Sequence, residues 1–149
     1  MGSKNQRALA IGAGACLWPS ALQRQYLVID IIDPREDILK VANDYFDFKL
    51  KEGTFYNNDC AKGFDFIEGA YDLILLDAYN GFKVNSLYSS ESVSRIYELL
   101  CDNGILVINN VHKNKRTLKY EIAQFKRYGY GYTEKSDEGY FNEVIFCFK

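Results

Sequence analysis

The residues of this chain that best suit chemistry by type and spacing are a glycine turn and the acids that follow it. Gly12-Ala13-Gly14 interrupts one apolar run, and the next apolar run reaches Asp30 and Asp33. Glycine has no Cβ, so its backbone permits close approach of a ligand, and the N–H groups that open the next helix donate to polar ligand groups. An acid at the end of the second strand lies where the ribose hydroxyls of a nucleotide bind. The stretch 8–33 therefore predicts half of a nucleoside-cofactor site, with either Asp30 or Asp33 on the ribose.

This pattern has a plain alternative. It lacks the third glycine of the dinucleotide-binding fingerprint, and a glycine turn between a core strand and a helix would look the same. Asp33 also has a second interpretation, as the N-cap of the helix that follows it.

Two further acids follow predicted strands. Asp59 comes after a short strand predicted over 54–58, and Asp77 ends the apolar segment YDLILLD at 71–77. Because parallel sheets bind ligands at the carboxyl edge of their strands, Asp77 is a candidate general base. Each acid has a structural alternative: Asp59 as the cap of a brief helix, Asp77 as a carboxylate that holds loop N–H groups. His112, the one histidine of the sequence, is a second candidate base or a solvated loop residue.

Apolar runs that alternate with helical patterns must position these residues, and this order predicts a parallel sheet with helices on its faces. We expect a first strand over 8–11, a short helix that begins near Pro19, and a second strand that opens at Tyr26. Asp33-Pro34-Arg35-Glu36 has the form of a capping box, with Asp33 at the N-cap. The buried stripe of the helix behind it is predicted to consist of Ile38, Val41, Ala42, Tyr45 and Phe46.

The second half of the chain continues the alternation. Segment 71–77 is the most apolar and is predicted to be the central strand. Ser89 or Ser90 would cap the next helix, and Asp102-Asn103-Gly104 would end it, with a fifth strand over 104–110. A last helix is expected around 118–125, and 130–135 with 140–148 are expected to pair as an antiparallel hairpin across the turn at 136–139.

Composition restricts the class of protein. At 149 residues, 48% hydrophobic and with a formal net charge of −2, the sequence predicts one globular domain without a global charge that favours nucleic acid. No apolar run approaches the ~20 residues that span a bilayer, and the N-terminal apolar run is too short for a signal peptide. The cysteines at 16, 60, 101 and 147 form no C-x-x-C pair, which argues against a zinc site or a disulfide framework. We expect reduced thiols, a cytoplasmic location and no bound metal.

Five βα units closed by an antiparallel hairpin resemble the class I S-adenosylmethionine-dependent methyltransferase superfamily, and in particular its spermidine synthase-like branch. The resemblance covers nearly all of residues 8–148 and rests on short segments: IGAG at 11–14, IDP at 32–34, NDC at 58–60, YDLILLDAY at 71–79 and GILVINN at 104–110. It implies a single Rossmann-like three-layer α/β domain over 1–149. Its mostly parallel seven-stranded sheet would have the order 3-2-1-4-5-7-6, with strand seven antiparallel.

The resemblance also implies S-adenosylmethionine as cofactor and assigns roles to individual residues. The turn Gly12-Ala13-Gly14 would line the methionine part, and Asp30 or Asp33 would hold the ribose, since Ile31 stands where relatives have their ribose acid. Asp59 would accept from the adenine amino group with the Cys60 N–H beside the ring, and Asp77 would be catalytic and would also contact the cofactor. The wall of the acceptor pocket would consist of Tyr79, Asn80, Asn109, Asn110 and His112, and Tyr79 would also contact the cofactor.

Differences between this sequence and the spermidine synthase-like branch favour one function over another. Spermidine synthases carry a second Asp after the matching Asp77, where this chain has Asn80, and a neutral amide cannot pair with the ammonium group of a polyamine. Aminopropyl transfer is therefore less favoured than methyl transfer. A degenerate relative that serves as a binding or dimerisation module is the main alternative. An NAD-dependent oxidoreductase would need a parallel sixth strand.

The sequence says little about partners. The methyl acceptor is an unidentified small molecule or protein, and neither a membrane nor nucleic acid is expected to be a partner. A short chain with 12 Tyr and 10 Phe favours a homodimer, because aromatic residues are enriched at protein interfaces.

Overall fold

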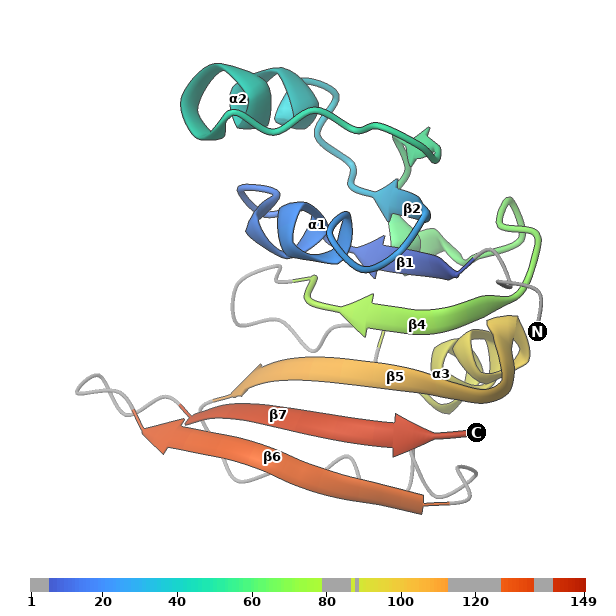
Figure 1. Cartoon of the computed structure of the whole chain (residues 1–149). Coiled ribbons are helices and arrows are strands. Elements are labelled where there is room, and N and C mark those ends of the chain that lie inside the picture. The colour runs from blue at the N-terminus through green and yellow to red at the C-terminus, as the bar shows by residue number, and fades with distance from the viewer. Residues whose placement is uncertain (1–5, 79–86, 88, 113–126, 136–140) are drawn as a thin grey trace.

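The chain folds around one seven-stranded sheet with the order β3-β2-β1-β4-β5-β7-β6 (Figure 1). This computed structural model describes residues 6–78, 87, 89–112, 127–135 and 141–149. The strands are β1 (Arg7–Ile11), β2 (Val28–Ile32), β3 (Phe55–Tyr56), β4 (Tyr71–Leu76), β5 (Leu100–His112), β6 (Arg127–Lys135) and β7 (Phe141–Phe148). Strands β1 to β5 run parallel to one another, whereas β7 runs antiparallel to both β5 and β6. The predicted order, the central place of β4 and the antiparallel strand seven are confirmed.

Helices pack on both faces of this sheet. The helical elements are α1 (Leu17–Leu22), α2 (Ile38–Phe46), the 3₁₀ turn η1 (Cys60–Lys62) and α3 (Ser90–Leu99). Buried residues of α3 share one apolar core with Leu9 and Ile11 of β1. Residues of α2 and the α1 cap share another with Ala8 and Ala10. Alternate side chains of a strand point to opposite faces, so β1 is buried on both sides and separates the two cores.

The predicted capping box at Asp33 is wrong. Helix α2 begins only at Ile38, its N-cap is Asp37, and the cap has no side-chain hydrogen bond. The physical reason lies in the Asp33 carboxylate, which accepts hydrogen bonds from the backbone of Ala13 and Arg35 instead. The predicted stripe is also only partly correct: Ile38 and Ala42 are buried, but Tyr45 and Phe46 are 78% and 50% exposed.

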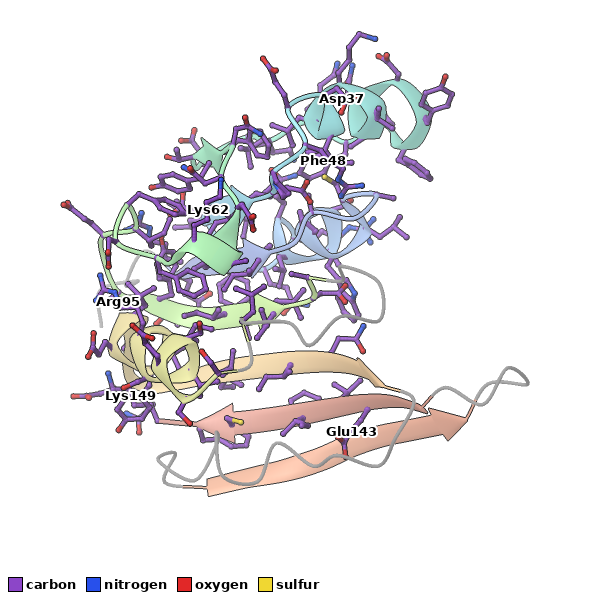
Figure 2. All side chains as sticks on the ribbon, turned by 180° about the vertical axis from the view of Figure 1, so that it is seen from behind. Asp37, Phe48, Lys62, Arg95, Glu143 and Lys149 are labelled. Carbon is purple, nitrogen blue, oxygen red and sulfur yellow. The ribbon has the colours of Figure 1, made fainter. Side chains whose placement is uncertain are left out.

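Helix α3 begins as predicted and ends earlier. The Ser89 side chain accepts from the Ser92 N–H and caps the helix. The helix stops at Leu99, because buried Leu100 already pairs with Tyr71 as the first residue of β5. Gly104 therefore lies inside the strand and does not end the helix, and the left-handed residue is Asn103, with φ 64°. Lys149 lies beside α3 (Figure 2), where its Nζ donates to the carbonyls of Tyr97 and Leu100 at 3.0 and 2.7 Å.

The helix around 118–125 and the turn at 136–139 lie outside the described residues. All four cysteines are free thiols, with Cys16, Cys60 and Cys147 buried. Within the described ranges, no helix combines the length and apolar character needed to cross a membrane.

Candidate functional site

The glycine turn joins the carboxyl ends of three strands. The Gly12 N–H donates to the Ile32 carbonyl at 2.8 Å, and the Asp77 N–H donates to the Ile11 carbonyl at 2.9 Å. Gly12 has φ +90°, and a Cβ at this position would lie 2.6 Å from the Asp77 carbonyl oxygen. Any side chain here would therefore collide with the backbone that carries Asp77. The turn after β1, the end of β2 and the end of β4 form one continuous edge.

Beyond Gly12 the turn opens to its surroundings. Gly14 has φ +54°, and a Cβ built there would meet no atom within 4 Å. Cys16, at the N-cap of α1, is left-handed as well. Positive φ thus recurs at Gly12, Gly14 and Cys16, and of the two glycines in this turn Gly14 is the one whose Cβ position faces open space. The turn therefore leaves space beside Gly14 that a ligand could occupy.

Asp33 closes the turn from the β2 side. Its buried carboxylate accepts from the Ala13 N–H at 2.9 Å and from the Arg35 N–H at 3.0 Å. The Arg35 guanidinium adds two donors in bidentate geometry, with Nε and Nη2 each 2.8 Å from one carboxylate oxygen. Burial alone would raise the pKa of Asp33, but the hydrogen bonds from Arg35 and Ala13 outweigh it and lower the pKa below its ordinary value. Asp33 therefore carries a charge that the turn holds in place.

Asp30 occupies a different part of the sheet. Its fully buried carboxylate contacts Arg7 Nη2 at 2.6 Å, the Tyr71 hydroxyl at 2.7 Å and the Thr54 N–H at 2.8 Å. Arg7 and Tyr71 are the first residues of parallel strands β1 and β4, so these contacts lie toward the amino edge, opposite the glycine turn. Of the two acids proposed for the ribose, the structure places only Asp33 beside the turn.

Asp59 and Cys60 follow β3 on the same side as Asp33. The Asp59 side chain accepts from the Ala61 N–H at 3.0 Å and so caps η1, as its structural alternative predicted, while the residue stays exposed. The segment is tied to Asp33 through Asn57 Nδ2, which donates to the Asp33 carbonyl at 3.3 Å. Burial, with the charges of Asp59 and Asp33, raises the pKa of the Cys60 thiol to about 12. Cys60 is therefore an uncharged core residue, and only its backbone is suited to contact a ligand.

Asp77 has a partner that the sequence analysis did not assign. Asn109 Nδ2 donates to Asp77 Oδ1 at 2.7 Å. The register explains the contact: Leu76 faces Ile108 across the parallel pair β4–β5, so the next residue of each strand also lies side by side. Burial raises the pKa of Asp77, and the hydrogen bond from Asn109 opposes this shift. Counting from the two apolar segments in parallel register would have found this pair.

The remaining predicted positions are not placed. Tyr79 and Asn80 lie outside the described residues, and for Asn110 and His112 only the backbone is described, as part of β5. No group of three His, Cys, Asp or Glu side chains within the described ranges is arranged to hold a metal ion.

A groove of about 560 Å³ lies between the segment 61–65, which follows Asp59 and Cys60, and α3. Lys62 and Arg95 flank it (Figure 2), together with the acids Asp65, Glu91 and Glu98. Neither the glycine turn nor Asp77 lines this groove, and its charges are mixed. We therefore place the candidate site at the carboxyl edge and not in the groove.

The fold has clear counterparts among solved structures. A probable spermidine synthase from Corynebacterium glutamicum aligns with a TM-score of 0.76 at 17% identity, over 96% of this chain and 56% of that one. This chain thus spans little more than half of that relative. The N-methyltransferase NodS from Bradyrhizobium japonicum aligns at 0.71 and 13% identity, over 96% and 85% of the two chains. An rRNA methylase from Streptococcus thermophilus aligns at 0.67 and 13%, over 97% and 88%.

These likenesses concern the fold. No model of a protein family matches the chain, and no curated protein matches it in sequence. NodS has also been solved with S-adenosyl-L-homocysteine bound. The strand order, the antiparallel β7 and these structural neighbours agree with the resemblance found in the sequence, so the chain has the fold of the class I S-adenosylmethionine-dependent methyltransferases.

Proposed function

We propose that this protein is an S-adenosylmethionine-dependent methyltransferase. The observation that carries the proposal is the joined carboxyl edge, where an open glycine turn, the charged Asp33 and the half-buried Asp77 meet. In open α/β sheets this edge is where ligands bind. The similar fold of NodS, which has been solved with the product S-adenosyl-L-homocysteine, supports the choice of cofactor.

Each part of the cofactor would have a matching group. The turn at Gly12–Gly14 would hold the methionine part, Asp33 the ribose, and Asp59 with the Cys60 N–H the adenine. Gly14 fits this role because a Cβ there would meet open space. When bound, S-adenosylmethionine supplies a methyl group on a sulfonium, which is a strong electrophile with a neutral leaving group. The protein then mainly has to position the acceptor, which is a large part of the acceleration in such transfers.

Asp77 is the residue that we propose to accept a proton from the methyl acceptor. Its pKa is raised by burial, which brings a carboxylate closer to the range useful for a base near neutral pH. Asn109 fixes the carboxylate through Oδ1. Tyr79, Asn80, Asn110 and His112 remain proposed members of the acceptor wall.

A non-catalytic binding or dimerisation module is the second candidate. One observation favours it: the Asp33 carboxylate is already filled by donors of this chain. Aminopropyl transfer to a polyamine remains the less favoured reaction, because Asn80 replaces the second acid. We propose that the methyl acceptor is a small molecule or another protein. We also propose that this protein forms a homodimer and is located in the cytoplasm.

Calorimetric titration tests the cofactor. The purified protein is titrated with S-adenosylmethionine, S-adenosylhomocysteine, decarboxylated S-adenosylmethionine and NAD. The Asp59→Ala variant is compared with Glu68→Ala, which removes an exposed acid from the same region. Binding of S-adenosylhomocysteine that weakens in Asp59→Ala but not in Glu68→Ala supports the proposal. Preference for the decarboxylated compound would support polyamine chemistry, and no binding of any compound would leave the non-catalytic module.

A further inference from the structure

We propose that Arg35 sets the affinity of this site for a ribose-containing cofactor, because its guanidinium must leave the Asp33 carboxylate before the ribose hydroxyls can bind there. The proposal rests on the proposed function, since it assumes that Asp33 is the ribose ligand. Arg35 would then be a residue of this chain that competes with the cofactor for one carboxylate.

The donors on Asp33 make this competition necessary. A carboxylate has about four lone-pair positions. Four N–H groups already point at the two oxygens of Asp33: the backbone N–H of Ala13 and of Arg35, and the Nε and Nη2 groups of Arg35, all at 2.8–3.0 Å. The two hydroxyls of a ribose would need two of these positions.

The guanidinium is the donor that can leave. The Ala13 N–H belongs to a turn held by further backbone bonds, from Gly12 to Ile32 and from Cys16 to Ala13. The Arg35 N–H is fixed two residues from Asp33 by the chain itself. The Arg35 side chain, by contrast, is 53% exposed, although the carboxylate that it contacts is 4% exposed. Its departure breaks no element of the fold.

The surroundings also favour an exchange over a permanent pair. Asp37, two residues after Arg35 in the sequence, also attracts the guanidinium, and both Asp33 and Asp37 raise the pKa of Arg35. A guanidinium that leaves Asp33 therefore keeps an acid nearby. The two ribose hydroxyls then replace the Nε and Nη2 donors of Arg35 on the Asp33 carboxylate. Asp33 keeps its number of hydrogen bonds, and only its ion pair with Arg35 is lost.

Titration of S-adenosylhomocysteine into variants tests the competition. Arg35→Gln should bind about fivefold more tightly than the wild-type protein, as expected for loss of a competing, partly exposed ion pair. Arg35→Lys, which keeps the charge but not the bidentate geometry, should lie between the two. Arg24→Gln removes an exposed arginine elsewhere and should bind as the wild type does.

Salt gives a second, independent readout. Because salt screens an exposed ion pair, a higher salt concentration should tighten binding to the wild-type protein and affect Arg35→Gln much less. Equal or weaker binding by Arg35→Gln, or the same salt response in both proteins, would overturn the role of Arg35 while leaving the proposed function intact. If neither protein binds S-adenosylhomocysteine, both the proposed function and this inference fail.

Discussion

Replacement of Asp30 by asparagine should separate the stability of the sheet from the function of its edge. The Asp30 carboxylate holds Arg7, Tyr71 and Thr54 together at 2.6–2.8 Å. An amide in its place would direct N–H groups at the Arg7 guanidinium, or at the Thr54 N–H in the flipped orientation, and so leave a buried donor unpaired. Breaking one partner of a buried ion pair costs about 3–5 kcal/mol. The Arg7 side chain is 32% exposed and can recover water, which reduces the estimate to about 2–3 kcal/mol.

This loss is large enough to measure. For a chain of this size it corresponds to a fall in the melting temperature of roughly 5–10 °C. Thermal denaturation followed by circular dichroism measures the fall, with Glu36→Gln as a control at an exposed acid. Calorimetry below the transition should show unchanged affinity for S-adenosylhomocysteine. An unchanged melting temperature would refute the structural role of Asp30, and a folded variant that has lost cofactor binding would refute the assignment of the ribose to Asp33.

Three further changes test other contacts. Asp33→Asn should lower the free energy of unfolding by about 2 kcal/mol at neutral pH. Because the folded-state pKa of Asp33 is lowered, the stability that its charge contributes is fully present above the unfolded-state pKa and is lost as the pH falls through the folded-state pKa. Urea denaturation should therefore show the stabilities of the variant and the wild type converging in acid. Asn109→Leu removes the hydrogen bond that opposes the burial shift, so the pKa of Asp77 should rise further, as read by NMR titration of its carboxyl carbon; an unchanged pKa would contradict the role of Asn109. Ser89→Ala removes the bond to the Ser92 N–H and should cost about 1 kcal/mol in chemical denaturation, with Ser90→Ala as the control one residue later.

The sheet was predictable because its signals are local and redundant. The parallel strands are apolar runs, and their alternation with helical patterns is enough to predict the parallel pairing, whereas the strand order was implied by the resemblance to the methyltransferase superfamily. The short α1 followed in the same way from the small distance between the glycine turn and Tyr26. The final hairpin followed from two apolar, aromatic-rich segments with a polar turn between them.

The errors arose where a side chain had two possible partners. Asp33 has the position of a helix cap, but the Ala13 N–H lies 20 residues earlier in the sequence and is invisible to a local pattern. The same reasoning explains Asp30, whose partners come from three other segments. The predicted end of α3 at Asn103-Gly104 was wrong because Leu100 pairs with Tyr71, which ends the helix at Leu99 and places the left-handed Asn103 inside β5. The site was thus predictable as a set of positions, and the contacts between them were not.

The close contact between Gly12 and the Asp77 backbone has a consequence for how this site can change. A Cβ at Gly12 would lie only 2.6 Å from the Asp77 carbonyl oxygen, so even an alanine there would push the backbone after β4 and displace Asp77, the proposed base. A substitution meant to alter cofactor binding at this position would therefore also be recorded as a loss of catalysis. Substitutions in the turn meet no steric clash at Gly14, which faces open space, whereas a substitution at Gly12 changes the cofactor turn and the position of Asp77 together.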